Sequence, residues 1–404
     1  MKTIITVFLV AVSLVFLVTC DIESSFTDLI SDKINDDLDT GGSDDSDDTG
    51  DEDDDGDPPD DPTWNILTLD SSASVGRYTS LVLDSDDYPH ISYYDDDNVH
   101  LKYIYKTSSG WENYDTIDND GDVGQYSSIA LNSNGNPCIG YYDAGNDSLK
   151  YAEFNGTAWD IEVVDDGATP YNVGRWTSLA MDGDIPHLIY FDSDTLDLKY
   201  AKWDDGSSAW DIEFVDAGTL LGPYNSLCID SGGIPHISFS YRSNYSLGYA
   251  HRNGGSWTVD PVDTTNGSGY YTSIILETDN KPHISIQDGL NDNLMYIHWD
   301  DDESKWNGQV NTDGPDTVDS TDVTGLYTSI ALDADGNPHI SYYDDTNNDL
   351  RYAYWNGSSW KTETVDSAGN MGSHTSIDLD SNGHAHISYY DATNESLKYA
   401  YRLK

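Results

Sequence analysis

The sequence predicts an all-β fold made of seven repeated four-stranded units, and three observations lead to this prediction. Acidic residues are abundant, but 64 of the 74 are Asp, which favours turns, and only 10 are Glu, which favours helices. Strand-like runs alternate with turn-forming stretches from residue 63 onward. A motif of the type Pro-His-Ile-Ser recurs at intervals of 47–49 residues, with one interval of 56. Its histidine position is occupied by His90, Cys138, His187, His236, His283, His339 and His386.

The sixth unit shows the pattern of one repeat. Its four strand-like runs are TSIALD (328–333), HISYYD (339–344), LRYAYW (350–355) and WKTETVD (360–366). The turn-forming stretches DADGNP, DDTNND and NGSS separate these runs. Four short strands in a unit of about 50 residues are the signature of a β-propeller blade. The chain from residue 63 to 404 is therefore predicted to be a seven-bladed β-propeller.

Tryptophans predict how the ring closes. A tryptophan opens the fourth strand of six units, at Trp111, Trp159, Trp210, Trp257, Trp306 and Trp360. The seventh unit ends at YAYRLK, after its third strand, whereas TWNILTLD precedes the first unit and has the pattern of a fourth strand. The strand that begins at Trp64 is therefore expected to complete the last blade, so that no sheet edge at the junction remains unpaired.

The first 20 residues have the proportions of an export signal. Lys2 precedes an apolar run from Ile4 to Val18, which is short for a membrane span. The run ends in Leu17-Val18-Thr19-Cys20, which resembles the bacterial lipobox. This resemblance implies lipidation of Cys20 and attachment to the cell envelope, at the periplasmic face or the cell surface. The alternative is an ordinary secretory signal and a secreted protein.

Residues 21–62 predict a disordered acidic tether. They contain 19 acidic residues and one lysine, with almost no aromatic side chain, and such a segment buries too little apolar surface to fold. The whole chain of 404 residues carries a formal charge of −56. A field of this sign repels nucleic acids and anionic lipids, so contact with the membrane is expected only through the N-terminal anchor.

The repeated histidines suggest catalysis at first sight, but their positions favour a structural role. Metal ligands must converge on one ion, whereas equivalent positions in separate blades are spread around a ring. The pattern resembles WD-repeat propellers, in which His, Ser or Thr, Asp and Trp form a buried network within each blade. The same residue types recur here as His339, Ser329, Asp344 and Trp360 in a different order and spacing, so the resemblance implies a structural role for them and not the same connections. No catalytic or metal-binding residue is predicted, and Cys138 and Cys228 are interpreted as buried thiols.

A second repeated feature is an Asp at the end of the second strand, opposite a basic residue of the third. We expect cross-strand ion pairs here. The acids are Asp95, Asp143, Asp192, Asp288, Asp344 and Asp391, and the bases are Lys102, Lys150, Lys199, Arg351 and Lys398. Unit four has Tyr241 and Gly248 at these two positions, and unit five has Met295 in place of the base. Calcium binding by the loops is the alternative, and no other cofactor is predicted.

A Gly-x-aromatic sequence before each first strand supplies the main ligand-binding candidates. They are Tyr78, Tyr126, Trp176, Tyr224, Tyr271 and Tyr327, and His374 takes the seventh position. Aromatic rings beside carboxylates and amides suit a sugar surface, because they stack on C–H faces and bind hydroxyls. The scheme resembles seven-bladed bacterial lectins, which implies several weak sites that act together. The alternative is that these aromatics pack between blades.

Units four and five depart most from the repeat. Arg242, His251, Arg252 and His298 occur there without counterparts in most other units. Arg and His together fit lyase chemistry, in which a base abstracts a proton and Arg neutralises a carboxylate. The alternative explanation is decay of the repeat on a neutral surface. The sequence thus favours an exported module that binds carbohydrate or a surface protein, with a polysaccharide hydrolase or lyase as the alternative.

Overall fold

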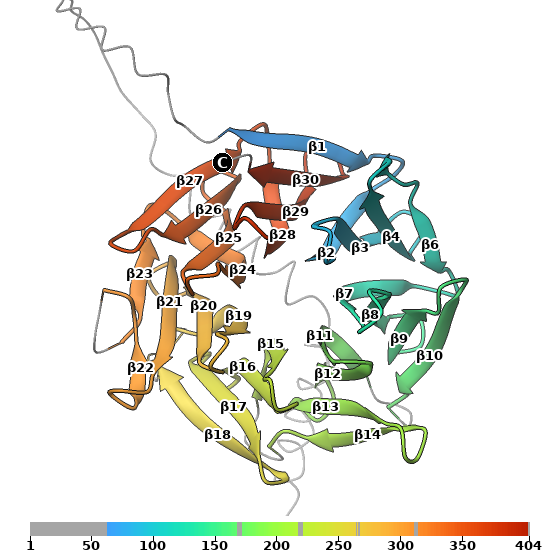
Figure 1. Ribbon diagram of the computed structural model, residues 1–404, viewed down its shortest axis with the longest axis horizontal. Helices are drawn as coiled ribbons and strands as arrows, with labels where there is room; N and C mark the ends of the chain where they lie inside the picture. Colours follow the sequence, from blue (N-terminus) through green and yellow to red (C-terminus); the bar gives the residue numbers. More distant parts are fainter. Residues whose placement is uncertain are drawn as a thin grey trace, which may run out of the picture. The chain divides into compact units, whose positions relative to one another are not determined.

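The computed structural model describes residues 63–167, 172–216, 221–263, 265, 267–310 and 314–402, and the described elements are all strands and turns. Seven antiparallel sheets stand around a common axis, as Figure 1 shows. The predicted seven-bladed β-propeller is therefore confirmed. The predicted signal at residues 1–20, with Cys20, and the tether at residues 21–62 lie outside the described residues. Within the described residues there is no helix long and apolar enough to cross a membrane.

The first four blades follow one another along the chain. Blade 1 contains β2 (Val75–Leu83), β3 (Pro89–Asp95), β4 (His100–Thr107), β5 (Gly110–Trp111) and β6 (Asp115–Asp118). Blade 2 contains β7 (Val123–Leu131), β8 (Pro137–Asp143), β9 (Ser148–Phe154) and β10 (Trp159–Asp165). Blade 3 contains β11 (Val173–Asp182), β12 (Ile185–Asp192), β13 (Asp197–Asp204) and β14 (Ala209–Phe214). Blade 4 contains β15 (Leu221–Ile229), β16 (Pro235–Tyr241), β17 (Leu247–Asn253) and β18 (Ser256–Asp263).

The last three blades complete the ring. Blade 5 contains β19 (Tyr270–Leu276), β20 (Pro282–Asp288), β21 (Asn293–Asp300), β22 (Lys305–Asn307) and β23 (Asp316–Asp319). Blade 6 contains β24 (Thr324–Leu332), β25 (Pro338–Asp344), β26 (Asp349–Trp355) and β27 (Trp360–Asp366). Blade 7 contains β28 (Met371–Leu379), β29 (Ala385–Asp391), β30 (Ser396–Arg402) and β1 (Trp64–Asp70). In each blade the first of these strands lies nearest the axis (Figure 1).

The two ends of the propeller meet in blade 7, as predicted. β1 pairs antiparallel with β30, and Trp64 stands opposite Arg402. Where blade 7 meets blade 1, a further hydrogen bond joins their inner strands: Asp378 of β28 accepts a hydrogen bond from the Leu83 amide of β2 at 2.9 Å. Blade 6 has Ala331 at the position of Asp378. Closure thus combines a shared sheet with an extra side-chain bond across the junction.

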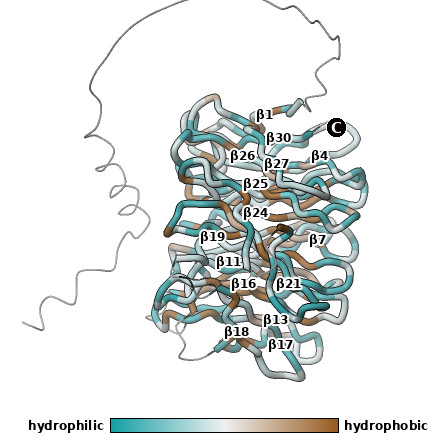
Figure 2. Tube along the Cα trace, turned by 90° about the vertical axis from the view of Figure 1, so that its left-hand side faces the viewer, coloured by the Kyte–Doolittle hydropathy of each residue, from teal (hydrophilic) through white to brown (hydrophobic). Residues whose placement is uncertain are grey.

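The apolar cores lie between blades rather than within them. One cluster joins Leu101 and Tyr103 of blade 1 to Ile129 and Tyr141 of blade 2, and all four side chains are buried. Figure 2 shows hydrophobic stretches, on the inner strands, alternating along the tube with hydrophilic stretches at the turns. Each blade contributes one of its two faces to the core on either side. No blade therefore buries its apolar surface without both neighbours.

Seven serine side chains link the inner strands in a closed belt. Each serine of the Thr-Ser pattern accepts a hydrogen bond from a backbone amide of the next blade, at 3.0–3.3 Å. The pairs are Ser80–Ile129, Ser128–Leu179, Ser178–Leu227, Ser226–Ile274, Ser273–Ile330, Ser329–Ile377 and Ser376–Leu81. An inner strand has a sheet partner on one side only, so these amides would otherwise lack an acceptor. The repeated serine is therefore a connector between blades.

Replacing one belt serine is expected to destabilise the whole ring. Ser128→Ala leaves the Leu179 amide without its acceptor, and we expect a loss of about 1–3 kcal/mol in the free energy of unfolding. Urea denaturation followed by tryptophan fluorescence measures this change. Ser108→Ala, at an exposed loop position, is the control and is expected to change stability by less than about 0.5 kcal/mol. Equal effects of the two substitutions would contradict the role of the belt.

Candidate functional site

The Gly-x-aromatic sequences form β-bulges that turn the aromatic residue toward the axis. In blade 1, Arg77 pairs with Tyr94 and Ser80 with Ser92, so Tyr78 and Thr79 together face a single residue of β3. A bulge of this kind re-aims one side chain of a strand. Gly76 is required beside it, because a Cβ atom there would lie 2.8 Å from the Cα of Leu397 in blade 7. The same register shifts recur in the other inner strands.

Six of the seven aromatic residues have a left-handed backbone. Their φ angles are 48–55°, at Tyr78, Tyr126, Trp176, Tyr271, Tyr327 and His374. This conformation is rare for bulky residues and costs energy unless the surrounding structure imposes it. Here the bulge and the close approach of the preceding glycine impose it. Strain of this kind is often found at ligand sites. It also recurs in the turn between the second and third strands of every blade, at Val99, Asp147, Leu196, Tyr245, Asp292, Asn348 and Glu395.

The seven side chains form a closed ring around the axis, which we call the aromatic collar. Consecutive ring centroids are 4.5–5.1 Å apart, except for 6.3 Å between Trp176 and Tyr224. The members are Tyr78, Tyr126, Trp176, Tyr224, Tyr271, Tyr327 and His374. A closed heptagon with sides of about 5 Å has its corners about 6 Å from the centre, within contact range of a ligand on the axis. All six candidates from the sequence are thus brought together.

The collar rings also pack on one another. Neighbouring planes are inclined by 41–64°. These values scatter around the turn of about 51° that relates adjacent members of a seven-bladed ring, so the ring planes stand nearly parallel to the axis. Each ring therefore leans on the next, as the packing alternative requires, and the same seven rings line a cavity. The collar is one continuous aromatic wall, and the expectation of several separate sugar sites does not describe this geometry.

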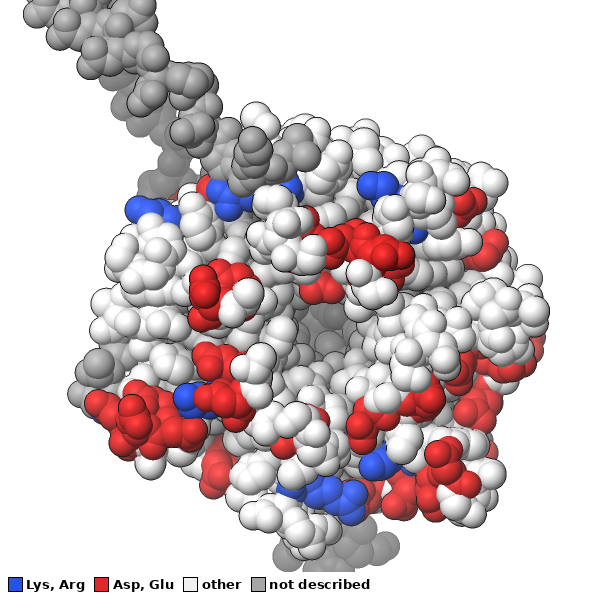
Figure 3. Space-filling model, viewed as in Figure 1, with Lys and Arg blue, Asp and Glu red and all other residues white. Residues whose placement is uncertain are grey.

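A second tier of polar side chains lies directly beside the collar. It comprises the residue after each aromatic: Thr79, Ser127, Thr177, Asn225, Thr272, Thr328 and Thr375. In five blades the hydroxyl is hydrogen-bonded to a serine of the preceding blade, at 2.7–3.0 Å. The collar and this tier together line a cavity of ≈ 230 Å³ on the axis. Figure 3 shows the molecule hollowed at its centre, with acidic side chains in groups on the surrounding face.

The repeated histidines lie away from the cavity, in hydrogen bonds between neighbouring strands. Each Nδ1 is hydrogen-bonded to a tyrosine hydroxyl thirteen residues further on, as in His90–Tyr103 at 2.5 Å and His187–Tyr200 at 2.6 Å. The other pairs are His236–Tyr249, His283–Tyr296, His339–Tyr352 and His386–Tyr399. Burial lowers the pKa of His187 to about 3. These side chains are engaged in the framework of their blades.

The four residues named with the WD-repeat resemblance have structural contacts, but they do not form one network within the blade. His339 contacts Tyr352 and lies 3.7 Å from Asp333 of the preceding turn, whereas Asp344 pairs with Arg351. Ser329 belongs to the serine belt, and the Trp360 indole donates to Asp316 of blade 5. The four residue types therefore take part in separate contacts, and two of these contacts, those of Ser329 and Trp360, lie between blades. The physical reason is the different spacing of the motif, which places His339 and Asp344 at opposite ends of β25.

The fourth-strand tryptophans pack against the tyrosines that bind the histidines. Each indole meets the tyrosine of the preceding blade edge-on, with centroids 5.1–5.4 Å apart. The pairs are Trp64–Tyr352, Trp111–Tyr399, Trp159–Tyr103, Trp210–Tyr151, Trp257–Tyr200, Trp306–Tyr249 and Trp360–Tyr296. The repeated His and Trp thus serve one structural unit that joins successive blades.

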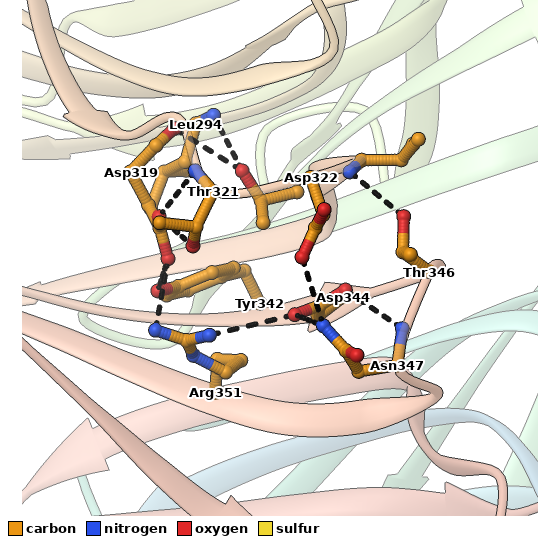
Figure 4. Close-up of polar contacts among 11 residues, drawn as sticks. Leu294, Asp319, Thr321, Asp322, Tyr342, Asp344, Thr346, Asn347 and Arg351 are labelled. Atoms are coloured by element: carbon orange, nitrogen blue, oxygen red, sulfur yellow. Dashed lines mark hydrogen bonds and ion pairs between the residues drawn. The ribbon is translucent and has the colours of Figure 1, made fainter. Parts of the chain in front are cut away.

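The predicted ion pairs are confirmed in four blades, and each has a second carboxylate that sequence reasoning missed. In blade 6, Arg351 lies 3.4 Å from Asp344 and 3.1 Å from Asp319, which also accepts a hydrogen bond from Tyr342 (Figure 4). The equivalent second acids in the other three blades are Asp70, Asp118 and Asp165. Each ends the fourth strand of the preceding blade and is followed by the turn to the next inner strand. A repeated Asp after that strand was the available signal. In blade 7, Lys398 pairs with Asp366, and no ion pair with the predicted Asp391 is found among the described residues.

Each basic side chain with its carboxylates forms a buried unit of opposite charges, which we call an Asp–Lys clamp. Burial raises the pKa of Asp118, but hydrogen bonds from Lys150 and Tyr141 outweigh it and hold this pKa below its ordinary value. Lys150 lies 2.5 Å from Asp118 and 3.6 Å from Asp143. The cation therefore lies within ion-pair distance of both carboxylates. Within the described residues, no group of three or more His, Cys, Asp or Glu side chains is placed to hold a metal ion.

The alternative site in blades 4 and 5 is not assembled by the fold. Arg242 follows the end of β16, whereas His251 stands opposite His236 at the start of that strand. Arg252 lies 3.3 Å from Glu213 of blade 3, in an ion pair at the outer strands. His298 stacks on His283 in blade 5, with ring centroids 5.3 Å apart. Arg242 and His251 thus lie at opposite ends of β16, while Arg252 and His298 have their contacts with Glu213 and His283.

Cys138 and Cys228 are both free thiols, as interpreted from the sequence. Burial raises the pKa of Cys138 to about 12. Cys138 replaces the histidine of blade 2 and faces Tyr151, the counterpart of the tyrosines above.

Comparisons with known proteins show the fold alone. No protein-family model and no curated protein matches the chain. An ulvan lyase from a new polysaccharide lyase family is similar in structure at 13% identity, with a TM-score of 0.53, over 83% of this chain and 95% of that chain. A mutant of AofleA from Arthrobotrys oligospora has 13% identity and a TM-score of 0.51, over 76% and 90%. The fucose-specific lectin from Aleuria aurantia has 11% identity and a TM-score of 0.50, over 74% and 97%. Propellers similar to this chain thus include both a lectin and a lyase.

The buried histidines predict a loss of stability in mild acid. Burial lowers the pKa of His339 and of His386 to about 4, so the unfolded chain takes up protons that the folded chain rejects. The contribution of these two histidines to the free energy of unfolding is complete above pH 6.5. It falls as the pH decreases from 6.5 to about 4, by an amount on the order of 2–3 kcal/mol for each histidine. Urea denaturation at stepwise pH values measures this slope.

The variant His339→Cys/His386→Cys, which copies the residue of blade 2, is expected to show a shallower slope between pH 6.5 and 4. His100→Cys, outside the repeated position, is the control. An unchanged slope in the double variant would show that these histidines do not govern the acid sensitivity.

Proposed function

We propose that this protein is an exported binding module that holds carbohydrate in the axial cavity. The aromatic collar carries the proposal, because it surrounds the axis with seven rings and places a tier of hydroxyl and amide groups beside them. Sugars need such a combination, since their C–H faces pack on aromatic surfaces and their hydroxyls bind short polar side chains. The left-handed backbone of six collar residues adds support, because the fold maintains this strain in six of the seven blades.

The geometry favours one ligand for each propeller. All seven aromatic residues converge on a single cavity of ≈ 230 Å³. This volume is below the range of about 300–1,000 Å³ for pockets that enclose drug-sized ligands. The cavity therefore suits one sugar residue, such as the end of a glycan chain. The formal charge of −56 favours a neutral ligand over an acidic one.

A glycan array probed with the purified chain tests this function, followed by calorimetric titration of the best-bound free sugar. Tyr126→Ala is expected to weaken binding at least tenfold, because it removes one ring of the collar, and tenfold corresponds to about 1.4 kcal/mol. Tyr114→Ala, a tyrosine 43% exposed in blade 1 and outside the collar, is the matched control. Wild-type protein that binds no glycan would overturn the proposal, and capture of a surface protein at the same cavity would favour the protein-binding alternative.

We further propose that the module is presented from the cell envelope by the acidic tether and a lipid on Cys20. The support is the lipobox-like Leu17-Val18-Thr19-Cys20 and the 19 acidic residues of segment 21–62. When the chain is expressed in a bacterium, the wild type is expected to partition into the detergent phase of Triton X-114. Cys20→Ala is expected to move it to the aqueous phase. Wild-type protein found only in the aqueous phase or in the medium would indicate an ordinary secretory signal.

A further inference from the structure

Resting on the carbohydrate-binding function above, we propose that His374 and Asn225 hold a single neutral sugar residue in one orientation, from opposite sides of the axial cavity. A cavity built from seven identical blades would present the same groups every seventh of a turn, so it could not orient an asymmetric ligand. Orientation requires positions where the repeat is broken with a polar group. The residues that line the cavity contain two such positions, one in the collar and one in the second tier.

His374 is the polar break in the collar. The other six members are five tyrosines and one tryptophan. Its imidazole lies between Tyr327 and Tyr78, at centroid distances of 4.5 and 4.6 Å. Burial, with a further contribution from Arg77, lowers the pKa of His374 to about 3, so the ring is neutral. A neutral imidazole offers one donor and one acceptor, which suits a sugar hydroxyl.

Asn225 is the polar break in the second tier. In five blades the corresponding Thr or Ser is hydrogen-bonded to a serine of the preceding blade. Blade 3 has Ile189 in place of that serine, so the Asn225 amide turns to the Pro223 carbonyl instead, at 3.0 Å. Its Oδ1 atom has no hydrogen-bond partner among the described residues. A buried acceptor without a partner is costly, and a ligand hydroxyl reached by rotation of the side chain would satisfy it.

The collar is widest where Asn225 stands. The centroids of Trp176 and Tyr224 are 6.3 Å apart, whereas the other six neighbours are 4.5–5.1 Å apart. The two rings remain in edge-to-face contact at this distance, so the wider spacing is a departure from the repeat beside Asn225 rather than an opening. Trp176 is also the largest ring of the collar and extends the apolar wall beside the interval. Two departures from the repeat, Asn225 and the Trp176–Tyr224 interval, thus lie together on one side of the cavity. The third, His374, is the opposing contact.

His374 and Asn225 face each other across the axis. His374 belongs to β28 of blade 7 and Asn225 to β15 of blade 4, and Figure 1 shows these strands on opposite sides of the central opening. Two polar groups on opposite sides of a narrow cavity define the rotation of a ligand about the axis. Arg77, the cation whose charge contributes to the lowered pKa of His374, lies 3.7 Å from Asp96 and 5.4 Å from the Tyr390 ring centroid. This pairing leaves the cavity suited to a neutral polyol.

The chain itself supplies the test variants, because other blades carry the repeat residues. His374→Tyr and Asn225→Thr restore the residues found in most blades, so both variants are expected to fold, which thermal melting checks. A glycan array selects the best-bound neutral sugar, and calorimetry then titrates that sugar and its monodeoxy analogues. We expect one site in the wild type and at least a tenfold loss of affinity in each variant. Each variant should also lose discrimination against a different monodeoxy analogue, since each removes a contact to a different hydroxyl.

The outcomes separate this inference from the proposed function. Wild-type protein that binds no glycan overturns both. Wild-type binding with one site, combined with unchanged affinity and analogue preference in both variants, overturns the role of His374 and Asn225 and leaves the carbohydrate function standing. Several sites per chain would overturn the single axial ligand. His100→Tyr, outside the cavity, is the control and should bind as the wild type does.

Discussion

The hydrogen bond from each inner-strand amide to a serine of the preceding blade is the constraint on which the rest of the molecule depends. A strand nearest the axis has a sheet partner on one side only, and its free amides face the neighbouring blade. Seven serines supply the missing acceptors, from Ser80 in blade 1 to Ser376 in blade 7. Because the belt is closed, the position of each blade is set by both neighbours, and the buried cores between blades keep their spacing.

The belt also explains why the collar has an unusual backbone. The belt serine must stay in register with the neighbouring amide, while the preceding glycine must pass close to a third strand of the previous blade. The residues between these two points are accommodated by a bulge, and the bulge places Tyr78 and its equivalents in the left-handed region. The aromatic side chain is thereby directed toward the axis. A structural requirement between blades thus creates the lining of the cavity.

Symmetry determines which repeated residues can act together. Equivalent positions far from the axis, such as the histidines or the Asp–Lys clamps, are separated from one another by whole blades, so each serves its own junction. Equivalent positions near the axis converge, so the seven collar side chains line one cavity. Departures from the repeat have different meanings for the same reason. In blade 4, Gly248 leaves room for the Phe239 and Tyr241 rings, which a Cβ atom would meet at 2.4 and 2.8 Å, whereas Asn225 changes the shared cavity.

Much of the fold could be predicted from the sequence. The period of Pro-His-Ile-Ser determined the number of blades, and Trp64 with the missing last strand determined the closure, because strand patterns and turn residues are local properties of the chain. The site could be predicted only as a set of residues. That Tyr78 and Tyr327 line one cavity, that Lys150 pairs with Asp118 of the preceding blade, and that Arg242 lies apart from His251 depend on the tertiary structure. The reason is that a repeat specifies what each blade contains, whereas the radius at which a side chain stands, and hence its neighbours in other blades, is decided only when the ring closes.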